Sequence, residues 1–331
     1  MTGIKTLRTL QPWLVRGFLF CSKKVRLYKV GKNISSNERN LFANNAPIRR
    51  VTSKKLHKVS HQSIFTLRVR YIVRTIKILP IKFLLPLKER YMKVIVCKDY
   101  DDMSKKASDL VISNMMEKPQ IKFGFATGSS PIGLYKNLIA AQEEGEISFK
   151  YSKSVNLDEY VGIDPNNSQS YSYFMHKNLF DHVAIKEENI HLPKAPEADE
   201  KYAIAYRKEL EEFGQRDIQI LGLGVNGHIA FNEPAKKLNK YASIVELDKS
   251  TIEANSRFFE NEDEVPKHAL SMGLAEIFDA RMIIVLANGK NKHEAVKRLL
   301  NDDKISTDLP CGLLNLHPNV YLFVDEEAYN G

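Results

Sequence analysis

The sequence predicts an α/β fold, a mostly parallel sheet with helices on both faces. Two observations support it. From residue 92 onward, apolar segments of strand length alternate with amphipathic segments of helix length. Several apolar segments also end in loops rich in glycine, hydroxyl or carboxylate residues. We therefore expect a Rossmann-like domain over residues 92–331, with its ligand beyond the carboxyl ends of the strands.

The individual elements follow from local patterns. Residues 93–97 form a β-branched run, and residues 101–116 form an amphipathic stretch with acidic residues at its start, which is typical of a helix. Pro131 and the hydroxyl residues before it are typical of a helix start. Strands are expected at residues 93–97, 121–126, 154–157, 218–223, 282–286 and 320–324, and helices at 101–116, 132–144, 168–180 and 292–300.

The composition limits the classes of protein to which this chain can belong. A chain of 331 residues with 43% hydrophobic content can bury a substantial core, as one large domain or two ordinary ones. No uninterrupted apolar run approaches the ~20 residues of a membrane span, so we expect no membrane association. The three cysteines are odd in number and lack metal or disulfide spacing. That pattern predicts a cytoplasmic location, where thiols stay reduced.

Charge divides the chain into two unlike parts. Residues 1–91 contain 21 lysines and arginines against two acids, a balance of +19, whereas residues 92–331 contain 28 bases and 38 acids, a balance of −10. The basic net charge of the whole chain therefore does not indicate nucleic-acid binding by the folded part.

The basic extension, residues 1–91, has three interpretations. It resembles mitochondrial targeting sequences in being basic and poor in acids, although those are usually shorter and amphipathic. A nucleic-acid-binding arm would also be basic, but no helix-turn-helix pattern is visible. We favour the third, that translation starts at Met92 and that the preceding residues are upstream sequence read in frame. If translated, residues 1–91 are expected to be disordered, because they lack a periodic apolar face.

A glycine-rich loop at residues 221–234, LGLGVNGHIAFNEP, follows an apolar strand and carries His228 and Glu233. Its glycines allow positive φ and close approach of the backbone to a ligand. His228 and Glu233 are five residues apart, so a loop brings them together more readily than a helix. A short motif of this kind can also be an ordinary strand-to-loop connection with a hydrogen-bonded histidine.

Two further loops follow predicted strands. Thr127, Gly128, Ser129 and Ser130 precede a helix, where free N–H groups and the helix dipole favour an anion; an ordinary helix cap is the alternative. Asp158 stands just beyond a buried strand, where a carboxylate is costly without a partner or a task; a turn cap is its alternative. We expect Glu159 to point the other way and to be structural.

Six motifs in order resemble the glucosamine-6-phosphate deaminase family. They are FATGSSPIGLY at 125–135, VNLDEYVG at 155–162, SYSYFMHKNLF at 170–180, GVNGHIAFNEP at 224–234, ANSRFF at 254–259 and GKNKHEAV at 289–296. The resemblance covers the chain from about Met92 to the end. It implies one catalytic domain that converts glucosamine 6-phosphate and water into fructose 6-phosphate and ammonia, in amino-sugar catabolism.

The resemblance also implies roles for individual residues. Arg257 and Lys292 match basic phosphate ligands, and Asp158 matches the base that moves a proton between C2 and C1 of the sugar. His228 would open the sugar ring, with Glu233 holding its tautomer or relaying charge. Some family members have aspartate at the position of Asn226, whose amide hydrogen-bonds but carries no charge.

No step of this reaction calls for a metal or an organic cofactor, and no zinc-type cluster is present in the sequence. The expected partner is a small sugar phosphate, with no nucleic acid and no membrane. A homo-oligomer and an allosteric effector site both stay open. A sugar-phosphate lactonase of related fold and a non-catalytic sugar-phosphate sensor are the rival functions.

We predict that residues 1–91 are dispensable, because they precede every residue with an assigned role. A chain started at Met92 should show the same melting temperature and the same kinetic constants as the full chain, measured by calorimetry and ammonia release. A lower melting temperature would make the extension part of the fold. Mass spectrometry of the native N-terminus tests the start at Met92, which peptides from upstream would contradict.

Overall fold

A computed structural model describes residues 92–247, 252 and 265–331. Its main feature is a seven-stranded sheet in the order β1-β10-β9-β6-β2-β3-β5, in which every neighbouring pair is parallel. The strands are β1 (Met92–Cys97), β2 (Lys122–Phe125), β3 (Lys153–Asn156), β5 (Ile190–His191), β6 (Ile218–Gly222), β9 (Met282–Ala287) and β10 (Val320–Asp325). All six predicted strands are present, so the predicted α/β fold is confirmed. Expectations for residues 1–91 lie outside the described residues.

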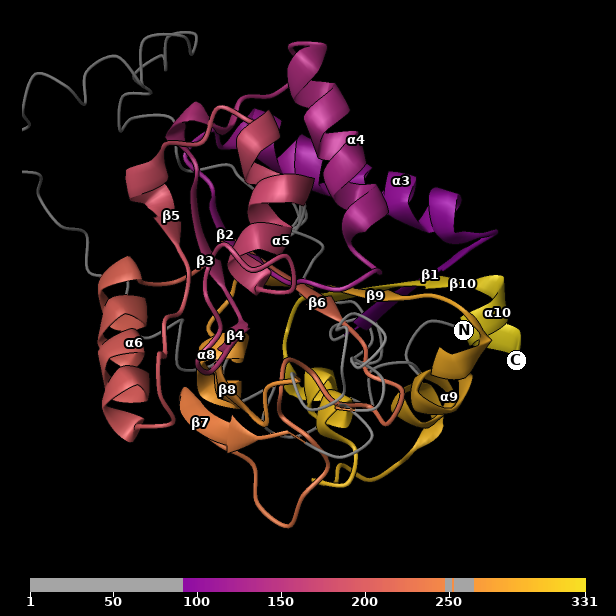
Figure 1. Cartoon of the computed structure of the whole chain (residues 1–331). Helices are drawn as coiled ribbons and strands as arrows, with labels where there is room; N and C mark the ends of the chain where they lie inside the picture. The colour runs from indigo at the N-terminus through magenta and orange to yellow at the C-terminus, as the bar shows by residue number, and fades with distance from the viewer. Residues whose placement is uncertain (1–91, 248–251, 253–264) are drawn as a thin grey trace, which may run out of the picture. The chain divides into compact units, whose positions relative to one another are not determined.

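Helices cover both faces of this sheet, as predicted. In Figure 1, α3, α4 and α5 lie on one side of it, and α8 and α9 lie on the other. The helices are α3 (Tyr100–Glu117), α4 (Ile132–Glu143), α5 (Tyr171–Asn178), α6 (Glu200–Phe213), α8 (Leu274–Phe278), α9 (His293–Asn301) and α10 (Glu326–Asn330). The four predicted helices occur as α3, α4, α5 and α9. Helix α5 begins three residues later than expected because Ser170 caps its first turn, accepting from the Tyr173 N–H.

Helix α6 was not predicted, although the sequence contains the signals of a helix there. Asp199 accepts a hydrogen bond from the Lys201 N–H at the start of the helix, and Gly214 follows its last residue with a φ of +74°. The buried side chains recur at helical spacing, at Ala203, Tyr206, Leu210 and Phe213. An N-cap, an apolar stripe and a terminal glycine together predict a helix.

A small antiparallel sheet was also not predicted. It consists of β4 (Asp158–Tyr160), β8 (His268–Ser271) and β7 (Ser243–Glu246), in that order. Each strand is at most four residues long, too short to show a period of two in the sequence. This sheet carries Asp158, one of the predicted site residues, which pairs with Ser271.

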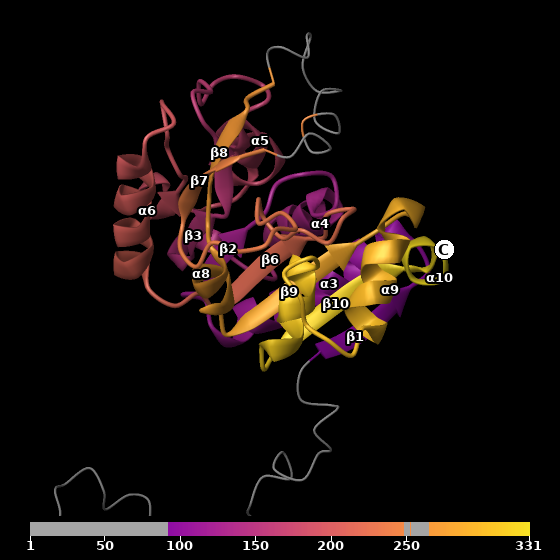
Figure 2. The same cartoon turned by 90° about the horizontal axis from the view of Figure 1, so that it is seen from below.

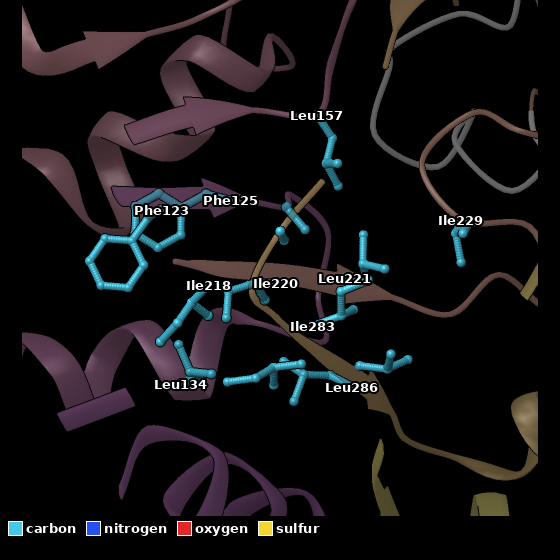
Figure 3. Packing of buried hydrophobic residues seen from close by; sticks show 14 of the residues in the cluster. Phe123, Phe125, Leu134, Leu157, Ile218, Ile220, Leu221, Ile229, Ile283 and Leu286 are labelled. Carbon is cyan, nitrogen blue, oxygen red and sulfur yellow. The ribbon is translucent and has the colours of Figure 1, made fainter. Parts of the chain in front are cut away.

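The core lies on both faces of the central strands. Residues of β2, β6, β9 and α4 belong to one buried cluster, part of which Figure 3 shows. The Phe123 and Phe125 rings stack on one face of β2, with centroids 4.9 Å apart. Residues 283–287 of β9 are all buried, as expected for a parallel strand covered on both faces.

Strand order places a topological switch between β2 and β6. From β2 the chain proceeds outward through β3 to β5, whereas from β6 it proceeds in the opposite direction through β9 to β10. Figure 2 shows β6 between β9 and β2 from below. In sheets of this type, ligands bind beyond the carboxyl ends of the strands at such a switch. None of the helices in the described ranges is long and apolar enough to cross a membrane.

Candidate functional site

Two polar side chains of the loop after β6, those of Asn226 and Glu233, meet at the imidazole of His228. Its Nδ1 lies 2.8 Å from Asn226 Oδ1 and 3.1 Å from Glu233 Oε2. Asn226 Nδ2 donates to the same Glu233 oxygen at 2.7 Å. The side chains of His228 and Glu233 are only 23% and 15% exposed, so these bonds form away from bulk water. The predicted His228–Glu233 pair therefore exists, and Asn226 completes it.

The partners of Nδ1 determine the tautomer of His228. Both are oxygen atoms that accept hydrogen bonds, so we assign the proton of the neutral ring to Nδ1. Nε2 then carries the lone pair, and it has no hydrogen-bond partner within the described part of the chain. The ring can accept a proton at Nε2 while Glu233 stabilises the resulting cation.

Two glycines of this loop allow the arrangement, each for its own reason. A Cβ on Gly224 would lie 2.5 Å from the His228 ring, so the close approach requires a residue without a side chain. Gly227 has a φ of +85°. Gly222, by contrast, has neither a positive φ nor an atom within 4 Å of an added Cβ.

A tight turn over residues 229–232 brings Glu233 back to the imidazole. Ala230 takes a φ of +51°, and the Asn232 N–H donates to the Ile229 carbonyl. Strand β8 anchors the turn, because the Phe231 N–H donates to Ser271 Oγ and Asn232 Nδ2 donates to the Met272 carbonyl. The sequence analysis did not single out Ser271 or Asn232, whose roles depend on contacts distant in sequence.

Asp158 lies in β4, beside Ser271 and thus beside the anchor of the imidazole loop. Its side chain is buried, and no described residue forms a hydrogen bond with its carboxyl group. Burial, and to a smaller extent the neighbouring charge of Glu159, raises the pKa of Asp158 to about 8. This carboxyl group therefore has the high proton affinity of an effective base near neutral pH.

The neighbouring carboxylate, Glu159, has a different environment. It accepts hydrogen bonds from the N–H groups of Tyr160, Tyr171 and Ser172, at 2.8–2.9 Å. Burial raises the pKa of Glu159, and these three amides oppose the rise. Because two of them belong to the first turn of α5, Glu159 fixes that helix end to β4. Its geometry supports the structural role expected from the sequence.

Three aromatic rings surround these carboxylates and link the two loops. Tyr160 and Tyr171 have ring centroids 4.8 Å apart, and Phe231 lies 6.1 Å from each. Tyr160 belongs to the strand of Asp158, and Phe231 belongs to the turn between His228 and Glu233. Tyr160 and Phe231 are themselves buried, so these rings form an apolar cluster between β4 and the turn.

The loop of Thr127, Gly128, Ser129 and Ser130 joins β2 to α4. Pro131 occupies the N-cap position, so α4 begins at Ile132 as predicted, although no side chain caps it. Instead, the Tyr100 hydroxyl donates to the Ser129 carbonyl and accepts from the Gly133 N–H, which holds the loop against α3. Ser130 Oγ donates to Asn288 Oδ1 at 2.7 Å.

Of the two basic residues of the predicted phosphate site, the structure describes Lys292 only. Lys292 ends a short 3₁₀ turn, Lys290–Lys292, at the carboxyl end of β9 and directly before α9. It therefore stands at the same edge of the sheet as the loop after β2. Arg257 lies outside the described residues.

Neither described cysteine belongs to a cluster of potential metal ligands, and residues 92–247, 252 and 265–331 contain no group of three His, Cys, Asp or Glu residues arranged to hold a metal. Cys311 packs beneath the imidazole loop, where its N–H donates to the Gly227 carbonyl. Burial raises the pKa of the Cys311 thiol to about 12, so it stays protonated at neutral pH and serves in packing.

We predict that Asp158→Asn stabilises the protein in a pH-dependent manner. Because the folded-state pKa of Asp158 is about 8 and the unfolded value is near 3.8, stability is lost as pH rises from about 4 to about 8. Asparagine has no charge to bury, so the gain in melting temperature should be near zero at pH 4 and largest above pH 8. Equal gains at both pH values in calorimetry would contradict a raised pKa.

Comparison with known proteins assigns the family. The model of the glucosamine-6-phosphate isomerases/6-phosphogluconolactonases matches residues 99–322. A glucosamine-6-phosphate deaminase of Thermoanaerobacter pseudethanolicus is 46% identical over 238 residues, which cover 72% of this chain and 94% of that protein. One from Clostridium novyi is 45% identical, with coverage of 72% and 98%.

Solved structures agree with this assignment. A monomeric glucosamine-6-phosphate deaminase superposes with a TM-score of 0.69 at 37% identity, covering 72% of this chain and 99% of that one. A 6-phosphogluconolactonase of Trypanosoma brucei has a TM-score of 0.59 at 18% identity, covering 73% and 98%, and shows a shared fold only. The chain thus belongs to the glucosamine-6-phosphate isomerase/6-phosphogluconolactonase family.

Proposed function

We propose that this protein is a glucosamine-6-phosphate deaminase, which converts glucosamine 6-phosphate and water into fructose 6-phosphate and ammonia. Relatives that are 44–46% identical over nearly their whole length carry that activity in their names. The observation that supports the chemistry most directly is a buried carboxyl group, Asp158, that has no hydrogen-bond partner among the described residues and lies next to the strand that anchors an oriented imidazole, His228. Aldose–ketose isomerisation needs one base for carbon-bound protons, and ring opening needs another acid/base group.

His228 carries out ring opening in this proposal. Its Nε2 removes the proton of the O1 hydroxyl, and the C1–O5 bond breaks as the imidazolium returns that proton to the ring oxygen O5. Glu233 and Asn226 hold Nδ1–H in place, so that the lone pair of Nε2 points away from them. Glu233 offsets the positive charge that develops on the ring, which an asparagine at position 226 cannot do alone.

Asp158 then transfers the proton of the isomerisation. Its carboxylate removes the C2 proton of the open-chain aldehyde, while O1 gains a proton given up by the substrate ammonium group, which forms an enolamine. The same carboxyl group then returns the C2 proton to C1, which leaves an iminium group at C2. Water adds to this iminium group and ammonia leaves, which yields the ketone. The desolvated site makes the carboxylate a stronger base than in water, and the pKa of about 8 matches proton transfer near neutral pH.

The phosphate group is assigned to the loop of Thr127, Gly128, Ser129 and Ser130, with Lys292 and Arg257 supplying positive charge. Within the described residues, the N–H groups of this loop donate no hydrogen bond, and the loop precedes the twelve-residue helix α4. Unpaired amides at a helix start bind oxyanions, and a lysine or arginine adds the charge that amides lack.

We further propose that the protein acts in the cytoplasm on a small sugar phosphate in amino-sugar catabolism, with neither nucleic acid nor organic cofactor. The acidic balance of residues 92–331 and the cysteine pattern support this placement. Assembly into a homo-oligomer is compatible with the proposed activity.

The proposed activity is tested by incubation with glucosamine 6-phosphate. We expect stoichiometric release of ammonia and fructose 6-phosphate, and a loss of roughly 10²–10⁴-fold in kcat for Asp158→Asn, because general-base catalysis contributes about that much. The Asp158→Asn variant should still bind a non-reactive analogue of the sugar phosphate. Hydrolysis of 6-phosphogluconolactone without ammonia release would favour the lactonase alternative, and binding without turnover of either compound would indicate a sensor.

We also predict that Gly224→Ala lowers kcat by at least tenfold with little effect on phosphate binding. The added Cβ would lie 2.5 Å from the His228 ring, so the ring must turn away from Glu233. The matched control is Gly222→Ala, in the same segment, where no atom lies within 4 Å of the added Cβ. Steady-state kinetics on both variants make the comparison, and equal effects would show that the close approach to His228 is not the cause.

A further inference from the structure

A hydrogen bond joins the two halves of the proposed phosphate site. Ser130 Oγ, from the loop after β2, donates to Asn288 Oδ1, the first residue after β9, at 2.7 Å. Strands β2 and β9 are not neighbours, because β6 lies between them in the sheet. The bond therefore passes across the carboxyl end of β6, the strand that leads to the His228 loop.

Both ends of this bond are themselves anchored. On one side, the Tyr100 hydroxyl holds Ser129 and Gly133, on either side of Ser130 and Pro131. On the other side, the N–H of Gly289 donates to both carboxylate oxygens of Asp325 at 2.9–3.0 Å. The Asp325 carboxylate also accepts from the Ala328 N–H, so it is fixed at the end of β10. The Ser130–Asn288 bond thus connects two anchored turns.

We propose that Asn288 is a positioning residue for the sugar phosphate, because it holds the amide-lined loop after β2 at a fixed separation from the turn that carries Lys292. This inference rests on the proposed function. Asn288 acts through Ser130 and Lys292 and contributes to ground-state affinity more than to proton transfer. The Ser130 hydroxyl, engaged by Asn288, serves this bridge, while the Ser130 N–H remains available to an anion.

The physical reason is preorganisation. A phosphate held by backbone amides on one side and an ammonium group on the other needs both at hydrogen-bond distance at once. Without the bridge, the turns can separate, and binding must reorder them at a cost in affinity. The loss of one hydrogen bond of this kind corresponds to roughly three- to tenfold in a dissociation constant.

The test compares Asn288→Ala, Ser130→Ala and the double variant in the full chain. Each single variant should raise KM for glucosamine 6-phosphate roughly three- to tenfold and raise the inhibition constant of inorganic phosphate by the same factor, with kcat within about twofold. If loss of the hydrogen bond is the cause, KM and the phosphate inhibition constant of the double variant should be no higher than those of the more impaired single variant. The reason is that each substitution removes the same interaction.

Asn291→Ala is the matched control, since it removes an exposed amide from the same turn as Asn288 and should change neither constant. Unchanged phosphate affinity in both single variants, additive effects in the double variant, or a fall in kcat at constant KM would each overturn the proposal. Ser130→Ala removes the bond from the other side, so the test survives if Asn288→Ala does not fold. Calorimetric titration with inorganic phosphate tests Asn288 even if the wild-type chain releases no ammonia, which would refute only the deaminase assignment.

Discussion

Parallel pairing of β6 with β2 on one side and β9 on the other is the interaction on which the rest of this structure depends. It places the carboxyl ends of three strands side by side, and the loop after each strand carries a different part of the proposed site. The imidazole comes from β6, the amide-lined loop from β2 and Lys292 from the turn after β9. Backbone hydrogen bonds fix the register of these strands. The strands therefore determine where the side chains of the proposed site lie.

The small antiparallel sheet supplies the remaining group. Strand β4 continues directly from the region of β3 and brings Asp158 opposite Ser271, whose hydroxyl also accepts from the turn between His228 and Glu233. One serine thus connects the strand of Asp158 to the imidazole loop. The Tyr160, Tyr171 and Phe231 rings pack against one another beside this strand. Asp158 itself is buried, and burial raises its pKa.

Asp158 and Glu159 show how two adjacent carboxyl groups acquire different properties. Both are buried, and burial raises the pKa of each. Glu159 is compensated by three backbone N–H groups, whereas Asp158 has no such donor among the described residues and also experiences the charge of Glu159. The polar network therefore stabilises the anchored carboxylate and leaves proton affinity high on the other. A buried group of this kind costs stability, which is common at functional sites.

The sequence by itself determined the alternation of strands and helices, the loops that end the strands, and the local pairing of His228 with Glu233. These depend on contacts within a few residues, such as hydrophobic periodicity, an N-cap or a glycine that permits close approach. Helix α6 could also have been predicted from Asp199, its apolar stripe and Gly214, although it was not identified. The tertiary structure alone decided the strand order, the antiparallel sheet, the burial of Asp158, and the contacts of Ser271 and Asn288. Ser130 and Asn288 are 158 residues apart, and whether two such positions meet depends on the packing of the whole sheet, which no local pattern encodes.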